Sequence, residues 1–87
     1  MVPRILLSTP AQKQFQALDA RTRDRVRKAL TRFAGTGRGD VKRLQGVSGG
    51  EHLFRLRIGD LRIIYRETEK DLQVIQILNR SQAYSWL

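Results

Sequence analysis

The sequence contains no cysteine, one histidine and two prolines. Without cysteine there can be no disulfides, thiolate metal sites or cysteine nucleophiles. The single histidine, His52, leaves little scope for a metal site, so neither a metal nor another cofactor is expected. No apolar run approaches the ~20 residues that span a bilayer, and the apolar part of the first ten residues is too short for a secretory signal. These absences predict a cytoplasmic protein with no membrane partner.

Acidic residues are also scarce, because 8 Asp and Glu face 17 Lys and Arg, and the formal net charge is +9. Such an excess destabilises a compact state through self-repulsion, so it implies a polyanionic partner, either nucleic acid or an acidic protein. Hydrophobic residues make up 40% of the 87 residues, which is enough for one modest core. The composition therefore predicts a single folded domain over residues 1–87, not a disordered basic tail.

The first half of the chain predicts a strand followed by two helices. Residues 3–8 are short and apolar, which is typical of a strand. Ser8 or Thr9 can cap a first helix over residues 10–18, and Pro10 suits its first turn. Asp19 is a natural cap for a second helix, which Gly35 is expected to close. That second helix carries one apolar stripe with helical spacing, formed by Val26, Ala29, Leu30, Phe33 and Ala34.

A polar, glycine-rich connection is expected after the second helix, with Leu44 as its anchor to the core. Its glycines do not match a P-loop, because no Gly-Lys-Ser/Thr follows them. Three strands are then predicted over residues 52–58, 61–67 and 72–78, and the last is apolar enough to be covered on both faces. The predicted fold class is α+β. An N-terminal strand and an antiparallel helix hairpin pack on a mainly antiparallel four-stranded sheet, and a short C-terminal tail follows.

The segment "FRLRIGDLRIIYR", residues 54–66, predicts a hairpin with a two-residue Gly59-Asp60 turn. This turn places Arg57 opposite Arg62. Residues on one side of the hairpin are apolar and form the expected core face: Phe54, Leu56, Ile58, Leu61, Ile63 and Tyr65. Every charged residue on the other side is an arginine: Arg55, Arg57, Arg62 and Arg66.

Two interpretations of this arginine face remain open from the strands alone. Like charges directly opposite each other cost a few tenths to ~1 kcal/mol, and side chains that splay into water can dilute that cost. Alternatively, the face is a preorganised anion site, since arginine can bind phosphate through two hydrogen bonds and stays charged. The tail favours the second interpretation. Arg80 and Tyr84 follow the last strand, near Arg57 and Arg62, and arginines beside an aromatic ring suit an unstacked base and its phosphates.

Taken together, these motifs resemble the RelE branch of the RelE/ParE superfamily of toxins from toxin–antitoxin systems. The most specific segments are "KRLQG" at residues 42–46, "FRLRIGDLRIIYR" at 54–66 and "ILNRSQAY" at 77–84. The resemblance implies an endoribonuclease that needs no metal and cleaves mRNA in the ribosomal A site. It also implies an acidic, RelB-like antitoxin that wraps and blocks the toxin, with operator DNA bound only through the complex of the two.

The resemblance also implies roles for individual residues. Arg62 matches the arginine that contacts the reacting phosphate, and Arg80 the late arginine that donates a proton or stabilises charge. Tyr84 matches the tyrosine that stacks on the base or activates the 2′-hydroxyl. Arg55 stands where the best-known members carry lysine, and Arg57 is typical of the "RLR-x-G" pattern. Further RNA contacts are expected from Lys42, Arg43 and Arg66.

Two positions depart from the family pattern: Leu53 stands where a lysine is expected, and Asn79 where many relatives have histidine. The general base stays open among Tyr84, His52 and a group of the ribosome or substrate. Two other functions also remain open, namely a ParE-like toxin that binds DNA gyrase and a non-catalytic RNA-binding module. For antitoxin binding, three isoleucines are expected to be exposed on the arginine side of the sheet: Ile64, Ile75 and Ile77.

Overall fold

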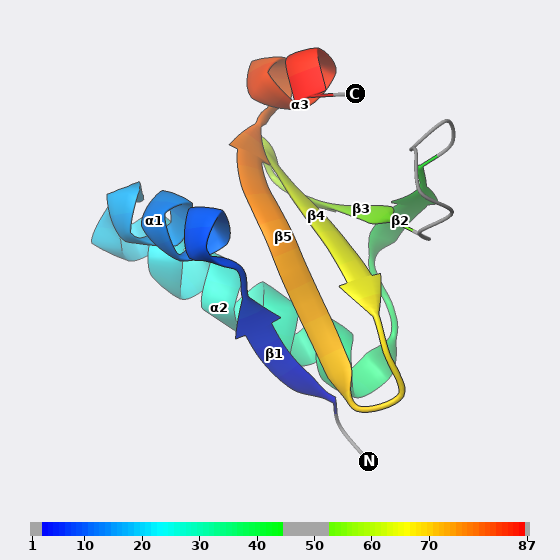
Figure 1. Cartoon of the computed structure of the whole chain (residues 1–87). Helices are drawn as coiled ribbons and strands as arrows, with labels where there is room; N and C mark the ends of the chain where they lie inside the picture. Colours follow the sequence, from blue (N-terminus) through cyan, green and yellow to red (C-terminus); the bar gives the residue numbers. More distant parts are fainter. Residues whose placement is uncertain (1–2, 45–52, 87) are drawn as a thin grey trace.

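The computed structural model describes residues 3–44 and 53–86, with only the backbone of residues 84–86. Two helices cover one face of a five-stranded sheet, and a short third helix sits at the end of the last strand (Figure 1). No helix in these ranges is long and apolar enough to cross a membrane. The elements in chain order are β1 (Arg4–Leu7), α1 (Thr9–Ala17), α2 (Ala20–Thr36), β2 (Asp40–Arg43), β3 (Phe54–Ile58), β4 (Leu61–Glu67), β5 (Asp71–Asn79) and α3 (Arg80–Trp86).

Helices α1 and α2 begin where their capping residues predict. The Ser8 hydroxyl accepts a hydrogen bond from the Ala11 amide, and the Asp19 carboxylate accepts one from the Thr22 amide, so both predicted caps are confirmed. The end of α2 was predicted wrongly. Gly35 lies inside the helix, and Gly37, in the left-handed conformation with φ 70°, ends it two residues later.

The sheet has the strand order β1-β5-β4-β3-β2, with β1 parallel to β5 and all other pairs antiparallel. The α+β class is confirmed, but the sheet has one strand more than predicted. The additional strand is β2, within the connection expected to be irregular. Val41 is its only apolar residue, and all of its residues are exposed because it forms an edge of the sheet. Its weak apolar pattern explains why it was missed.

The predicted hairpin register is confirmed. Arg57 pairs with Arg62, Leu56 with Ile63 and Phe54 with Tyr65. The predicted apolar face packs under α1 and α2, where the Tyr65 ring stacks on Phe54 and meets Phe33 edge-on, with both pairs of ring centroids 5.5 Å apart. Burial raises the pKa of the Tyr65 hydroxyl well above its usual range, so this tyrosine is a core residue and no proton acceptor.

A second, smaller core lies on the outer face of the sheet, which is the face turned away from α1 and α2. Leu53, Ile64, Leu78 and Ala83 form it, and Leu44 packs against it as predicted. The expectation that Ile64 is exposed is wrong, because this core buries it fully. Ile75 is only partly buried, at the edge of this core.

The placement of Ile77 on the outer face is also wrong. The pairing of β4 with β5 shifts between Ile64 and Tyr65, so that Ile75 is an extra residue without a partner on β4. A bulge of this kind changes the phase of the alternation along a strand. Ile77 consequently joins the core under the helices, while Leu78 takes the outer face opposite Arg62.

Candidate nucleic-acid interface

Three arginines gather on the outer face at one end of the sheet, where the β3–β4 turn meets the end of β5. Arg57 and Arg62 are cross-strand partners next to the turn. Arg80 is the first residue of α3 and directly follows Asn79, which pairs with Leu61. Arg57 and Arg80 are exposed, whereas Arg62 is partly buried. We call Arg57, Arg62 and Arg80 the arginine cluster.

Arg62 has the most constrained side chain of the cluster. One of its guanidinium nitrogens, Nη1, donates hydrogen bonds to the carbonyl oxygens of Gly59 (3.0 Å) and Leu61 (3.1 Å). Burial lowers the pKa of Arg62, the nearby charges of Arg57, Arg55 and Arg80 lower it further, and the nearby Asp60 carboxylate opposes them in part. A guanidinium remains charged at neutral pH even so. Positive charge is therefore concentrated here, at a cost that a bound anion would relieve.

Arg80 is placed by a cap that the sequence analysis missed. The Asn79 side chain accepts hydrogen bonds from the Gln82 amide (2.8 Å) and the Ser81 hydroxyl (3.0 Å), and the Gln82 side chain accepts one from the Asn79 amide (3.0 Å). This reciprocal pattern is a capping box, and Asn-x-x-Gln was its readable signal. It accounts for asparagine at the position where histidine was expected. The same cap starts the helix whose next turn carries Tyr84, of which only the backbone is described.

Arg55 lies on the same face but is already paired. Its Nη2 atom is 3.6 Å from Oδ1 of Asp40, and only 18% of its side chain is exposed. Lys42 lies opposite Arg55 on the edge strand, and both are on the outer face. Arg55 can therefore add charge to the site, but Asp40 competes with a substrate phosphate for its guanidinium.

Arg43 and Arg66, the remaining two residues predicted to contact RNA, lie away from the arginine cluster. Arg43 pairs with Phe54, whose ring is on the helix side of the sheet, so the alternation of β2 puts Arg43 on that side too. Arg66 lies on the outer face at the other end of β4, where its Nε donates to the Gln73 side chain (2.5 Å). An RNA contact by Arg43 stays a prediction, and its distance from the arginine face follows from β2, which was not predicted.

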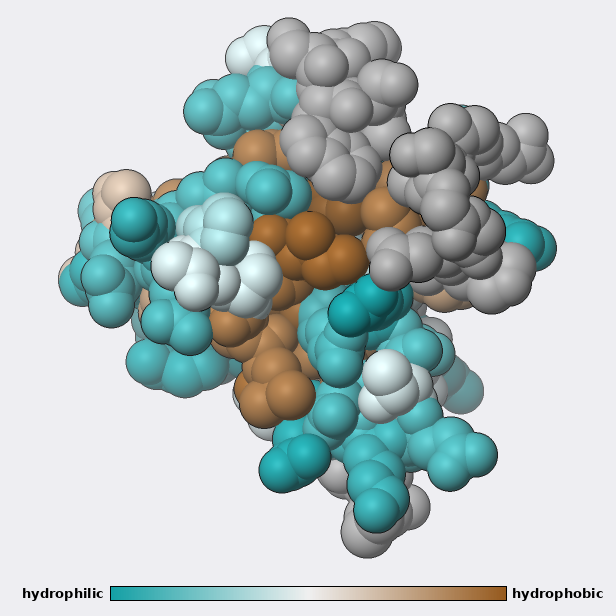
Figure 2. All heavy atoms as spheres, viewed as in Figure 1, coloured by the Kyte–Doolittle hydropathy of each residue, from teal (hydrophilic) through white to brown (hydrophobic). Residues whose placement is uncertain are grey.

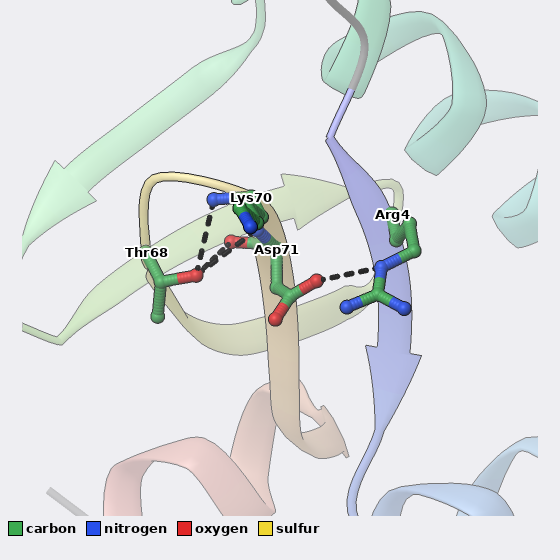
Figure 3. A network of polar contacts seen from close by, with 4 residues as sticks. All are labelled: Arg4, Thr68, Lys70 and Asp71. Atoms are coloured by element: carbon green, nitrogen blue, oxygen red, sulfur yellow. Dashed lines mark hydrogen bonds and ion pairs between the residues drawn. The ribbon is translucent and has the colours of Figure 1, made fainter.

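The opposite end of the sheet is built on hydrogen bonds and an ion pair at the β4–β5 turn. There the Thr68 hydroxyl accepts hydrogen bonds from the amides of Lys70 (3.4 Å) and Asp71 (3.0 Å), and Arg4 pairs with Asp71 at 3.0 Å (Figure 3). These contacts close the β4–β5 turn and join β1 to β5. Among residues 3–44 and 53–86, no group of three His, Cys, Asp or Glu residues could hold a metal ion.

A family model that matches most of the chain, together with this α+β topology, places the chain in a class: the toxins of the RelE/ParE superfamily. More particularly, residues 5–84 match the model of the ParE toxin of type II toxin–antitoxin systems, parDE, and the chain belongs to that family. A comparison with curated protein sequences found no significant match.

Several solved structures with the same fold come from toxin–antitoxin complexes. The archaeal RelE–RelB complex from Pyrococcus horikoshii has a chain 24% identical, with a TM-score of 0.75, 94% of this chain covered and 99% of that one. The isolated E. coli RelE toxin is 21% identical with a TM-score of 0.69, and the match covers 97% of this chain and 93% of that one. A chain of the E. coli DinJ–YafQ complex is 16% identical with a TM-score of 0.71, and the match covers 97% of this chain and 99% of that one. At sequence identities this low, the structural similarity shows that the fold is shared.

Proposed function

We propose that this toxin is an endoribonuclease that cleaves mRNA in the ribosomal A site without a metal ion and so inhibits translation. The observation that carries the proposal is the arginine cluster. Three arginines lie at one end of the sheet, and the pKa of Arg62 is lowered by burial and by its basic neighbours. Such a charge excess is unfavourable unless an anion binds, and a phosphodiester is the anion whose geometry the arginine fork fits.

The proposed reaction is attack of a 2′-hydroxyl on its own phosphodiester. The bond from O2′ to phosphorus forms while the bond from phosphorus to O5′ breaks, leaving a 2′,3′-cyclic phosphate and a 5′-hydroxyl. Negative charge grows on the non-bridging oxygens, where Arg62 is positioned to stabilise it, because its carbonyl contacts fix the guanidinium beforehand. Arg80 supplies a second positive charge or the proton for O5′. Tyr84, His52 or a group of the ribosome or substrate accepts the proton of the 2′-hydroxyl; His52 lies outside the described residues.

A second candidate function is inhibition of DNA gyrase by protein–protein binding, as in the ParE branch. The match of residues 5–84 to the ParE family model favours it. It requires no nuclease residues, so it leaves the positions of Arg62, Arg80 and Tyr84 unexplained. This is why we place RNA cleavage first.

A two-arm assay with the purified toxin separates the candidates. One arm measures the integrity of a reporter mRNA on translating ribosomes, and the other measures supercoiling of a relaxed plasmid by gyrase at the same toxin concentrations. We expect the mRNA to be cut and supercoiling to be unchanged. Inhibited supercoiling with intact mRNA would establish the gyrase function and refute the nuclease proposal.

We also propose that an acidic antitoxin of the RelB type binds this chain. Charge complementarity supports this, since the net charge is +9, and several structures of the same fold are toxin–antitoxin complexes. Figure 2 shows an apolar patch over β1 and β5, bordered by hydrophilic surface. Leu6, 41% exposed, and the half-buried Ile75 lie on this outer face. We infer that the antitoxin covers them together with the neighbouring basic surface.

Substitution Leu6→Asp tests that contact. Burying a leucine stabilises by about 1.5–3 kcal/mol, so the variant is expected to bind the cognate antitoxin at least tenfold more weakly in calorimetric titration. Val41→Asp is the matched control, because Val41 is the other exposed large hydrophobic residue among those described and lies on the opposite edge of the sheet. Equal affinities of Leu6→Asp and the parent would place the antitoxin elsewhere.

A further inference from the structure

A guanidinium from α2 lies against the turn that carries the arginine cluster. A Cβ atom built on Gly59 would be 2.9 Å from both Nη1 and Nη2 of Arg25 and 3.0 Å from its Cζ. Nearly equal distances to these three atoms mean that the flat face of the guanidinium is turned to the glycine. Gly59 has φ 57°, a conformation that favours glycine. The missing side chain at Gly59 is therefore what permits this close approach.

Arg25 is exposed. It makes no hydrogen bond or ion pair within residues 3–44 and 53–86. The nearest acid along the helix, Asp24, is held by Arg27 (2.6 Å) and Lys28 (2.9 Å). Asp60, next to Gly59 in the turn, forms no ion pair in the same part of the chain.

Arg25 and Arg62 approach the same residue from different sides. The Gly59 carbonyl accepts a hydrogen bond from Arg62, while the Arg25 guanidinium covers the Cα side. Positive charge consequently continues from the outer face of the sheet, around the β3–β4 turn, to α2. A nucleic-acid strand that places one phosphate on the arginine cluster can reach Arg25 with a neighbouring phosphate, since the two guanidiniums are separated only by one residue of the turn.

We propose that Arg25 is a further phosphate-binding residue, and that it holds the RNA strand beside the reacting phosphate with Gly59 as its platform. The inference rests on the proposed function in taking RNA as the ligand. Arg25 is not in the position of a catalytic residue. Its contribution is to binding, so it is expected to act on KM and to leave kcat unchanged.

The test is a binding titration of Arg25→Gln with a fluorescent 2′-O-methyl oligoribonucleotide of about 12 nucleotides, a length within the range of single-strand sites. The 2′-O-methyl groups prevent cleavage, so binding alone is measured. Loss of one phosphate contact is expected to weaken binding roughly threefold to tenfold. It should also reduce the slope of log K against log salt by about 0.7, the value for one phosphate of a single strand. Arg25→Lys keeps the charge and should recover part of the affinity.

Arg32→Gln is the matched control. Arg32 is exposed on the same face of α2, two turns and about 10 Å further along the helix. Its substitution by glutamine removes the same charge as Arg25→Gln. We expect it to bind RNA like the parent. Parental binding by Arg25→Gln, or an equal loss in Arg32→Gln, would overturn the inference. If the parent binds RNA but does not cut mRNA on ribosomes, only the proposed function fails. If the parent cuts mRNA on ribosomes but does not bind the free oligoribonucleotide, only the inference about Arg25 fails.

Discussion

Replacing Arg62 with alanine is expected to lower the rate of mRNA cleavage by about 10²–10³-fold, the usual cost of losing one preorganised donor to a transition-state oxyanion. The Arg62 guanidinium is held by the Gly59 and Leu61 carbonyls before substrate arrives, so it need not reorganise during the reaction. Arg80→Ala is expected to lower the rate similarly. Arg62→Lys should fall between alanine and the parent, because it retains the charge but not the two-pronged donor. Single-turnover cleavage on stalled ribosomes measures the effect.

Arg4→Ala is the control for these variants. Arg4 is also an arginine on the outer face, but it lies at the opposite end of the sheet and pairs with Asp71. Thermal unfolding of all variants checks that the fold persists, which is expected because Arg62 contributes only two hydrogen bonds to the carbonyls beside it and no part of either core. Cleavage by Arg62→Ala at the parental rate would remove the cluster from the reaction.

Tyr84→Ala is expected to slow cleavage by raising the free energy of the transition state by about 1–3 kcal/mol. This is the value of stacking one base on an aromatic ring. Residues 80 and 84 are about one turn apart in α3, so the backbone brings Tyr84 to the end of the sheet where Arg80 begins the helix. Both stacking and proton transfer are therefore open to this residue.

Tyr84→Phe separates the two roles, because it keeps the ring and removes the hydroxyl. If stacking dominates, Tyr84→Phe should cleave nearly as fast as the parent. If proton transfer dominates, it should be as slow as Tyr84→Ala, and a mixed role, which we expect, gives an intermediate rate. The pH dependence of cleavage adds a second readout, since loss of a titrating hydroxyl removes one limb of the profile. Unchanged cleavage by Tyr84→Ala would exclude Tyr84 from the site.

Much of the fold could be predicted because local chemistry determines it. A two-residue Gly59-Asp60 turn leaves one hairpin register, and the alternation then assigns every side chain of β3 and β4 to a face. The caps at Ser8 and Asp19 likewise placed the starts of α1 and α2. Gly37 was missed as the end of α2 because Gly35 is an equally good stop signal, and only the backbone conformation tells the two apart.

The features that were missed depend on tertiary pairing. Strand β2 has only one apolar residue, and it is a strand because β3 offers it a partner. The bulge at Ile75 was missed because it lies in a nearly continuous apolar run, yet it decides that Ile77 faces the helices. In the site, the meeting of Arg57, Arg62 and Arg80 could be predicted from the register. The ion pair of Arg55 with Asp40 and the contact of Arg25 with Gly59 could not, because each joins segments far apart in the chain.

The end groups of mRNA fragments test the central claim most directly. Translating ribosomes are incubated with the parent toxin and with Arg62→Ala, and the 5′ ends of the mRNA are mapped and tested for phosphorylation by polynucleotide kinase. We predict cuts confined to the A-site codon, with 5′-hydroxyl ends that accept phosphate, and loss of these cuts with Arg62→Ala. Intact mRNA, or fragments with 5′-phosphate ends, would contradict cleavage by 2′-hydroxyl attack at the arginine cluster.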